Sequence, residues 1–173
     1  GYEAMTTNTA GGEQNVAVGN YALDALTSGD NNTAVGHQAL SANNTGSGNV
    51  AIGKDVLDAN TTGSDNTGLG HNSLGANTTA SNNTGVGHGS LESNATGASN
   101  VAVGQAALAA NTTANNNTAV GNKALFSNIT GSNNTAIGHE ADVASAALTN
   151  ATAIGNGAVV SASNRIQLGN ANV

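Results

Sequence analysis

The chain has 173 residues, with no cysteine, proline or tryptophan, only two tyrosines and one phenylalanine, and a formal net charge of −7 at neutral pH. Aromatic and long aliphatic side chains supply most of the buried surface of ordinary globular proteins, so this composition excludes such a core. Three basic residues, Lys54, Lys123 and Arg165, cannot form the cationic cluster that a nucleic acid or an anionic membrane requires. The apolar runs are too short for a transmembrane helix. We therefore expect no nucleic-acid partner and no membrane insertion by this segment.

The chain reads as one repeat domain over residues 1–173. Residues 1–14 resemble the second part of a repeat, residues 15–155 hold regular 17-residue repeats, and residues 156–173 form a shorter repeat and an exit. Because the chain begins in the middle of a repeat and ends without a recognisable cap, we interpret it as a fragment of a longer fibrous protein.

A glycine marks the period. Eight consecutive intervals between these glycines are 17 residues long, without insertion or deletion. A fixed period of this kind is the signature of a solenoid and argues against disorder. The marker glycines are Gly19, Gly36, Gly53, Gly70, Gly87, Gly104, Gly121, Gly138 and Gly155.

The first phrase of each repeat, such as Asn117–Gly121, alternates in the manner of a β-strand. We predict that its Val, Ile or Leu faces a core, together with a leucine that follows five residues later. The predicted core is Val18, Leu23, Val35, Leu40, Ile52, Leu57, Leu69, Leu74, Val86, Leu91, Val103, Leu108, Val120, Leu125, Ile137 and Ile154.

The leucine phrase forms the second wall of each turn, and the Asn-, Thr-, Ser- and Gly-rich phrase, such as Asn60–Ser64, returns the chain to the next strand. Abundant Gly and Asn exclude a helical solenoid. The sequence thus predicts an all-β parallel β-roll with two short strands per 17-residue turn and one 14-residue turn between Gly155 and Gly169. Nine turns at the strand spacing would make a narrow rod about 40 Å long.

Small residues occupy the strand position opposite the predicted core. Because each turn holds few apolar side chains, we expect another surface to cover the rod, and small residues allow a second backbone to come close. We predict that copies of the chain pack through this row, which is Ala17, Ala34, Ala51, Gly68, Gly85, Ala102, Ala119, Ala136 and Ala153.

Three phrases, Asn49–Gly53, Asn134–Gly138 and Asn150–Asn164, resemble the head repeats of trimeric autotransporter adhesins, the YadA-like head. The ending Asn164–Val173 resembles the exit from such a region, and similar repeats occur in phage and bacterial fibres. The resemblance implies a left-handed parallel β-roll, a homotrimer and an extracellular location on a cell surface or virion. The family's usual repeat has 14 residues, which the interval from Gly155 to Gly169 matches and the 17-residue turns exceed.

Four histidines follow the marker glycine directly, at His37, His71, His88 and His139. Stacked turns would bring His71 and His88 about 4.8 Å apart, which could let them share a metal ion. The same position also holds Asn, Lys and Gln, and no acidic residue or cysteine recurs with it. We favour a solvated polar rim and predict no metal and no cofactor.

Asn-x-Thr sequons recur in the return phrase at Asn43, Asn60, Asn77, Asn94, Asn111 and Asn128, with others at Asn31, Asn82, Asn116, Asn133 and Asn150. They would be glycosylation sites on an exposed ridge in a glycosylating source. We favour a structural role, because Asn and Thr also build the return loop.

Two functions fit these patterns, and neither is enzymatic, since no catalytic motif is present. The first is a structural or adhesive segment of a trimeric surface or phage fibre, with a host-surface protein or glycan as a possible ligand. The second is an ice-binding or crystal-binding solenoid. Its candidate ladders are Thr33, Thr67, Thr84, Thr118 and Thr135 in the strands, and Thr45, Thr62, Thr79, Thr96, Thr113 and Thr130 in the return loops.

Overall fold

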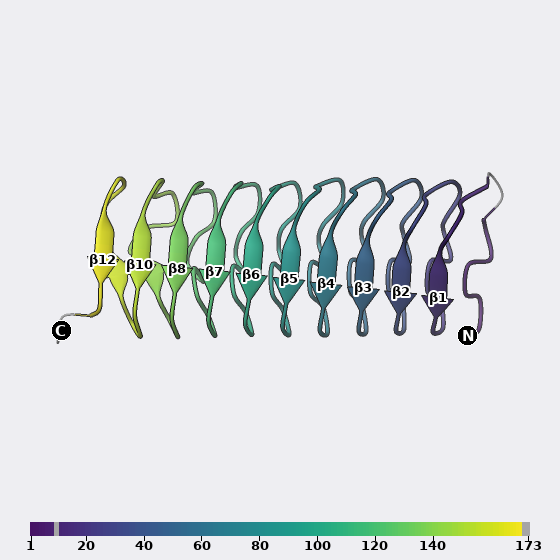
Figure 1. Ribbon diagram of the computed structural model, residues 1–173, viewed down its shortest axis with the longest axis horizontal. Helices are drawn as coiled ribbons and strands as arrows, with labels where there is room; N and C mark the ends of the chain where they lie inside the picture. The colour runs from purple at the N-terminus through teal and green to yellow at the C-terminus, as the bar shows by residue number, and fades with distance from the viewer. Residues whose placement is uncertain (9–10, 171–173) are drawn as a thin grey trace.

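The computed structural model describes residues 1–8 and 11–170, so the last residues of the predicted exit, 171–173, lie outside the described residues. These residues form an all-β rod in which successive turns stack side by side (Figure 1). No helix occurs in the described part of the chain. The strands are β1 (Val16–Val18), β2 (Thr33–Val35), β3 (Val50–Ile52), β4 (Thr67–Leu69), β5 (Thr84–Val86), β6 (Val101–Val103), β7 (Thr118–Val120), β8 (Thr135–Ile137), β9 (Asp142–Val143), β10 (Thr152–Ile154), β11 (Val159–Val160) and β12 (Ile166–Leu168).

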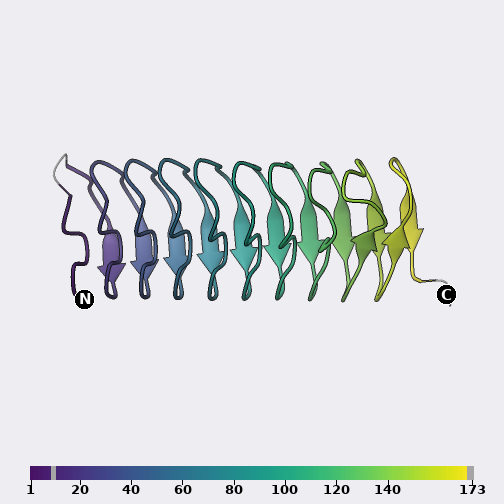
Figure 2. The ribbon, with the colours of Figure 1, turned by 180° about the vertical axis from the view of Figure 1, so that it is seen from behind.

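One parallel sheet of ten strands runs along the rod in the order β1-β2-β3-β4-β5-β6-β7-β8-β10-β12. Neighbouring strands pair residues 17 apart, as Ala34 pairs with Ala51, until the last pair, where Ala153 meets Gln167. Seen from behind, each turn repeats the path of the previous one (Figure 2). The parallel solenoid with 17-residue turns and a final 14-residue turn is therefore confirmed.

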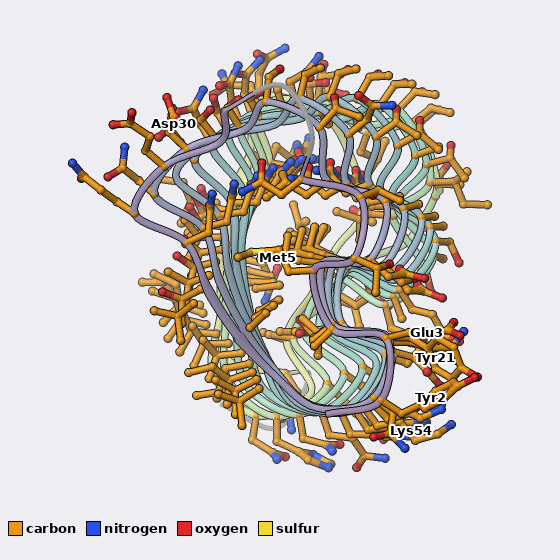
Figure 3. The ribbon with its side chains drawn as sticks, turned by 90° about the vertical axis from the view of Figure 1, so that its right-hand side faces the viewer. Tyr2, Glu3, Met5, Tyr21, Asp30 and Lys54 are labelled. Atoms are coloured by element: carbon orange, nitrogen blue, oxygen red, sulfur yellow. The ribbon has the colours of Figure 1, made fainter. Side chains whose placement is uncertain are left out.

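The leucines of the second phrase are fully buried, as predicted. Each adopts a left-handed backbone conformation with φ between +50° and +56°, which is unusual for a bulky residue and costs about 1 kcal/mol. This bend turns the side chain into the rod, where Met5 occupies the equivalent position at the N-terminal end (Figure 3). The buried leucines are Leu23, Leu40, Leu57, Leu74, Leu91, Leu108 and Leu125.

The strand residues face the opposite way from the prediction. The small residues point into the rod, with Ala34, Ala102 and Ala119 fully buried. The residues predicted as core point outward and are exposed or half-buried, and these are Val18, Val35, Ile52, Leu69, Val86, Val103, Val120, Ile137 and Ile154. The predicted packing row is accordingly interior: Ala17 is half-buried, and Ala34, Ala51, Gly68, Gly85, Ala102, Ala119, Ala136 and Ala153 are buried. In these strands the interior therefore holds an alanine or a glycine and not the branched residue.

The close approach that the small residues permit comes from the chain's own opposite wall. A Cβ atom on Gly68 would lie 2.4 Å from Cγ1 of Val56, and one on Gly85 would lie 2.5 Å from the hydroxyl of Ser73. Most other turns place alanine at both positions. Glycine therefore appears in the strand where the facing residue is larger, which keeps the volume of each layer nearly constant.

The prediction of two strands per turn holds only at the C-terminal end. There β9 and β11 pair in a second, two-stranded sheet. In the preceding turns the leucine phrase is bent by its left-handed residues and forms no strand in the described residues.

Two columns of buried asparagine fill the rest of the interior. The strand-side asparagines directly precede a strand, and the corner asparagines lie three residues after a buried leucine. In the strand-side column, Nδ2 of Asn32 donates to the Gly46 carbonyl at 2.9 Å, and its Oδ1 accepts the N–H of Asn49 at 3.0 Å. In the corner column, Nδ2 of Asn60 donates to Oδ1 of Asn43 at 2.8 Å. The strand-side asparagines are Asn32, Asn49, Asn66, Asn83, Asn100, Asn117 and Asn134, and the corner asparagines are Asn43, Asn60, Asn77, Asn94, Asn111 and Asn128. Amide ladders thus replace much of the apolar core.

Candidate functional site: the outward strand face

The outer surface of the ten-stranded sheet carries two parallel rows of side chains, which we call the strand face. Viewed along the rod, one wall holds ranks of side chains that are built mostly from carbon atoms (Figure 3). The mixed row consists of Val16, Thr33, Val50, Thr67, Thr84, Val101, Thr118, Thr135, Thr152 and Ile166. The aliphatic row consists of Val18, Val35, Ile52, Leu69, Val86, Val103, Val120, Ile137, Ile154 and Leu168.

The alternation of the strands builds this face. Each strand is only three residues long, and its central residue points inward, so the first and third residues both point outward. The parallel register places identical positions of successive turns next to one another, as in the pairing of Val35 with Ile52. As a result the aliphatic row continues without interruption along all ten strands.

The strand face is neutral and large for a narrow rod. Neither row contains a charged residue, although the chain as a whole carries a net charge of −7. Ten strands at about 4.8 Å, each about 10 Å long, give a projected area of roughly 500 Å². Contiguous apolar patches of this size on soluble proteins commonly mark interaction sites. Leu69 and Ile137 illustrate the exposure, with 43% and 44% of their surface accessible.

The threonines of the mixed row leave their hydroxyl groups free within the described residues. Thr33, Thr67, Thr84, Thr118, Thr135 and Thr152 all point outward on the strand face. None of these hydroxyls forms a hydrogen bond to another described residue, whereas return-loop threonines such as Thr61 and Thr78 bond to carbonyls of the next turn. The strand threonines can therefore bond to water or to a partner.

The four histidines lie on the surface next to the strand face, and all are exposed. The rings of His71 and His88 stack with centroids 5.2 Å apart. Nδ1 of His37 and Nε2 of His71 lie 3.7 and 3.8 Å from the two carboxylate oxygens of Asp55. Among the described residues, no three His, Cys, Asp or Glu side chains are arranged to hold a metal ion.

Asp55 takes its strongest partner from the adjacent residue. Nζ of Lys54 lies 2.6 Å from Oδ2 of Asp55 and, as the main cause, holds the pKa of this carboxyl group below its ordinary value. The other oxygen, Oδ1, is buried and has no hydrogen-bond partner in the described part of the chain. This cluster joins three consecutive turns on the surface of the rod.

The sequons divide into two groups. The corner asparagines are fully buried, so their amides support the interior and are not accessible in the folded chain. The structural role predicted for this group is confirmed. The second group precedes the strands and is exposed, at Asn31, Asn82, Asn116, Asn133 and Asn150.

The predicted site residues fall into two sets in the structure. The predicted small-residue packing row is wrong, because its members line the interior. The strand face was missed as a surface because its residues were predicted as core. The sequence does contain a signal for the correct direction. Glycine replaces the strand alanine at Gly68 and Gly85, close to the turns in which Val56, Ser73 and Ser90 replace the alanine before the leucine. This pattern indicates that the strand position and the position before the leucine face each other across the interior.

Comparison with known proteins adds no assignment, because no protein-family model and no curated protein sequence matches this chain. The described residues contain no helix that is long and apolar enough to cross a membrane.

Proposed function

We propose that this chain is a structural segment of an extracellular fibre, in which three copies lie side by side with their strand faces turned toward a common axis. The fibre holds or presents an attachment surface for a host protein or glycan and performs no catalysis. The left-handed coil and the number of chains come from the resemblance to trimeric adhesin heads. The single observation that carries the proposal is the aliphatic row, which stays outward on every strand of the main sheet.

The energetics favour a partner on this face. Covering roughly 500 Å² of largely apolar surface contributes on the order of 10 kcal/mol per chain at 25 cal/mol/Å². The interior consists mainly of alanine, one leucine per turn and asparagine, and this contribution equals that of several of the buried leucines. A second copy suits the face because both surfaces are neutral, whereas other parts of two chains with net charge −7 repel.

Sedimentation equilibrium on the purified chain tests the proposal. We expect a single species at about three times the chain mass of 16.6 kDa, independent of concentration in the micromolar range. A folded monomer under these conditions contradicts the proposal.

The strand face also supports a second candidate, an ice-binding or crystal-binding solenoid. The specific observation is that the strand threonines point outward at regular intervals on an uncharged sheet with free hydroxyls. This function needs the same face exposed, so it competes with assembly. A folded monomer that shows thermal hysteresis would favour this candidate, whereas a trimer without hysteresis supports the fibre.

A further inference from the structure

The mixed row is irregular in a way that the aliphatic row is not. Its apolar members stand on the first, third, sixth and tenth strands of the sheet, and threonines occupy the other strands. These apolar members are Val16, Val50, Val101 and Ile166. The intervals between them are 2, 3 and 4 strands for neighbours and 5, 7 and 9 strands for the other pairs, so no interval occurs twice.

This arrangement has a geometric consequence for two copies that lie parallel. In register, all apolar positions of one mixed row lie level with those of the other. Any parallel displacement aligns at most one apolar position with another, because all the intervals differ. Within the overlapping strands, every other apolar side chain then lies level with a threonine.

We propose that the order of apolar residues and threonines in the mixed row fixes the register in which neighbouring copies align. The inference rests on the proposed function, since it concerns the same face. When copies meet in register, each layer across the assembly contains either threonines or apolar residues from every chain. The threonine hydroxyls, which have no partner among the described residues, then find one another.

A displaced register mixes the two kinds of layer. A threonine hydroxyl that is covered beside valine methyl groups loses its water without gaining a hydrogen bond, and this is unfavourable. The aliphatic row cannot discriminate in this way because every member is apolar. The mixed row therefore acts as the register determinant, and the aliphatic row supplies apolar contact in any register.

A mixing experiment isolates the row order from other effects. An exchange variant, Val50→Thr with Thr84→Val and Val101→Thr with Thr135→Val, keeps the composition, moves two apolar residues by two turns each and leaves every interval between apolar residues different. Its own copies still match layer by layer, so we expect it to assemble alone like the native chain. A mixed assembly in register places valine beside threonine in four layers.

The native chain, labelled with nitrogen-15, is unfolded and refolded together with the exchange variant, and native mass spectrometry counts the mixed assemblies. We expect mixed species roughly tenfold or more below their statistical share, because several hydroxyls lose partners at once. The matched control carries Thr45→Val and Thr113→Val in the exposed return loops and should mix statistically with the native chain. If the fourfold variant does not fold, the twofold exchange Val101→Thr with Thr118→Val serves in its place.

Statistical mixing of the native chain with the exchange variant overturns the register inference and leaves the fibre proposal standing. Absence of any assembly by the native chain overturns both.

Discussion

The long turns and the final short turn return the chain to the next strand by different routes. In most of the long turns the chain passes through a corner that contains a buried asparagine, such as Asn94 followed by Gly97. In the short turn, the single residue Ala162 replaces this corner, and the chain forms strand β11 instead. The flanking positions are unchanged, since the Ser163 hydroxyl accepts the N–H of Thr149 in the way that the Ser64 hydroxyl accepts the N–H of Ser47.

The two asparagine columns stop together where the corner is lost. Asn134 is the last strand-side asparagine, and the next turn has Ala151 in its place. The columns depend on each other because both donate to the same corner carbonyl, as Asn32 and Asn43 both donate to Gly46. The turn from Gly138 to Gly155 keeps 17 residues but already has strand β9 and no corner asparagine, so the second strand accompanies the loss of the asparagine corner and not the shorter turn length.

Removing a corner from the middle of the rod should have the largest effect. Deletion of Asn94–Thr96 creates a short turn between long ones and interrupts the corner column on both sides. Several buried amide and carbonyl groups lose partners at about 1–3 kcal/mol each, so we expect a loss of about 5 kcal/mol or more in unfolding free energy. Chemical denaturation followed by circular dichroism measures this loss.

The matched deletion is Ser145–Ala147, in the corner next to the short turn, which has no asparagine. It should cost clearly less, since no buried amide is removed. Equal losses for the two deletions would show that the asparagine columns do not set the stability of the long turns.

A single strand-side asparagine should have an intermediate effect. Asn117 donates from Nδ2 to the Gly131 carbonyl at 2.9 Å and accepts the N–H of Asn134 at 2.9 Å. Replacing Asn117 by Ala leaves the N–H of Asn134 buried without its partner, while the Gly131 carbonyl still accepts from Nδ2 of Asn128, so we expect a loss of about 1–3 kcal/mol.

Its control is the neighbouring residue Asn116, which is exposed and has φ of +59°. Asn116→Gly keeps this conformation accessible and should change stability by less than about 1 kcal/mol. Thermal unfolding of the two variants decides the matter, and similar melting temperatures would be inconsistent with a structural amide column.

Asp142, where the second sheet begins, should give the smallest effect. Burial raises the pKa of Asp142, and hydrogen bonds from the N–H groups of Val143 and Ser127 only partly offset it. The folded chain therefore binds this proton more tightly than the unfolded chain, so stability rises as the pH falls from neutral toward the ordinary value near 3.8.

Asp142→Asn removes this dependence while one amide oxygen still accepts a backbone hydrogen bond. The variant should melt slightly above the native chain at pH 7, and the difference should shrink as the pH is lowered toward 4. A difference that grows on acidification would reverse the assigned sign.

The period, the leucine column and the hydrogen-bonding corner could be predicted from the sequence because each depends on residue type at a fixed interval. The direction of the strands could not be predicted from alternation alone, which defines two faces without saying which is inside. Size misled the prediction: in a wide core Val103 would be inside, but here the narrow interior accepts Ala102. The single strand in the turns that carry a left-handed leucine was also missed, since leucines of this kind, such as Leu108, have no sequence signature.

The candidate site depended on the same choice of direction. With the strand faces reversed, the outward row became a predicted core and the inward row a predicted contact. The pairing of a small Gly68 with a larger Val56 could have shown which strand face points inward. This pairing depends on the volume of side chains across the interior and not on hydrophobicity along the strand.

The most direct test of the account compares two pairs of arginine substitutions in neighbouring positions, by circular dichroism and sedimentation equilibrium together. Val103→Arg with Val120→Arg places charge on the strand face, and we expect a folded chain that sediments as a monomer. Ala102→Arg with Ala119→Arg places the same charge inside the rod, and we expect an unfolded chain. The opposite pattern, in which the alanine pair yields folded monomers and the valine pair unfolds, would contradict the assignment of the strand face.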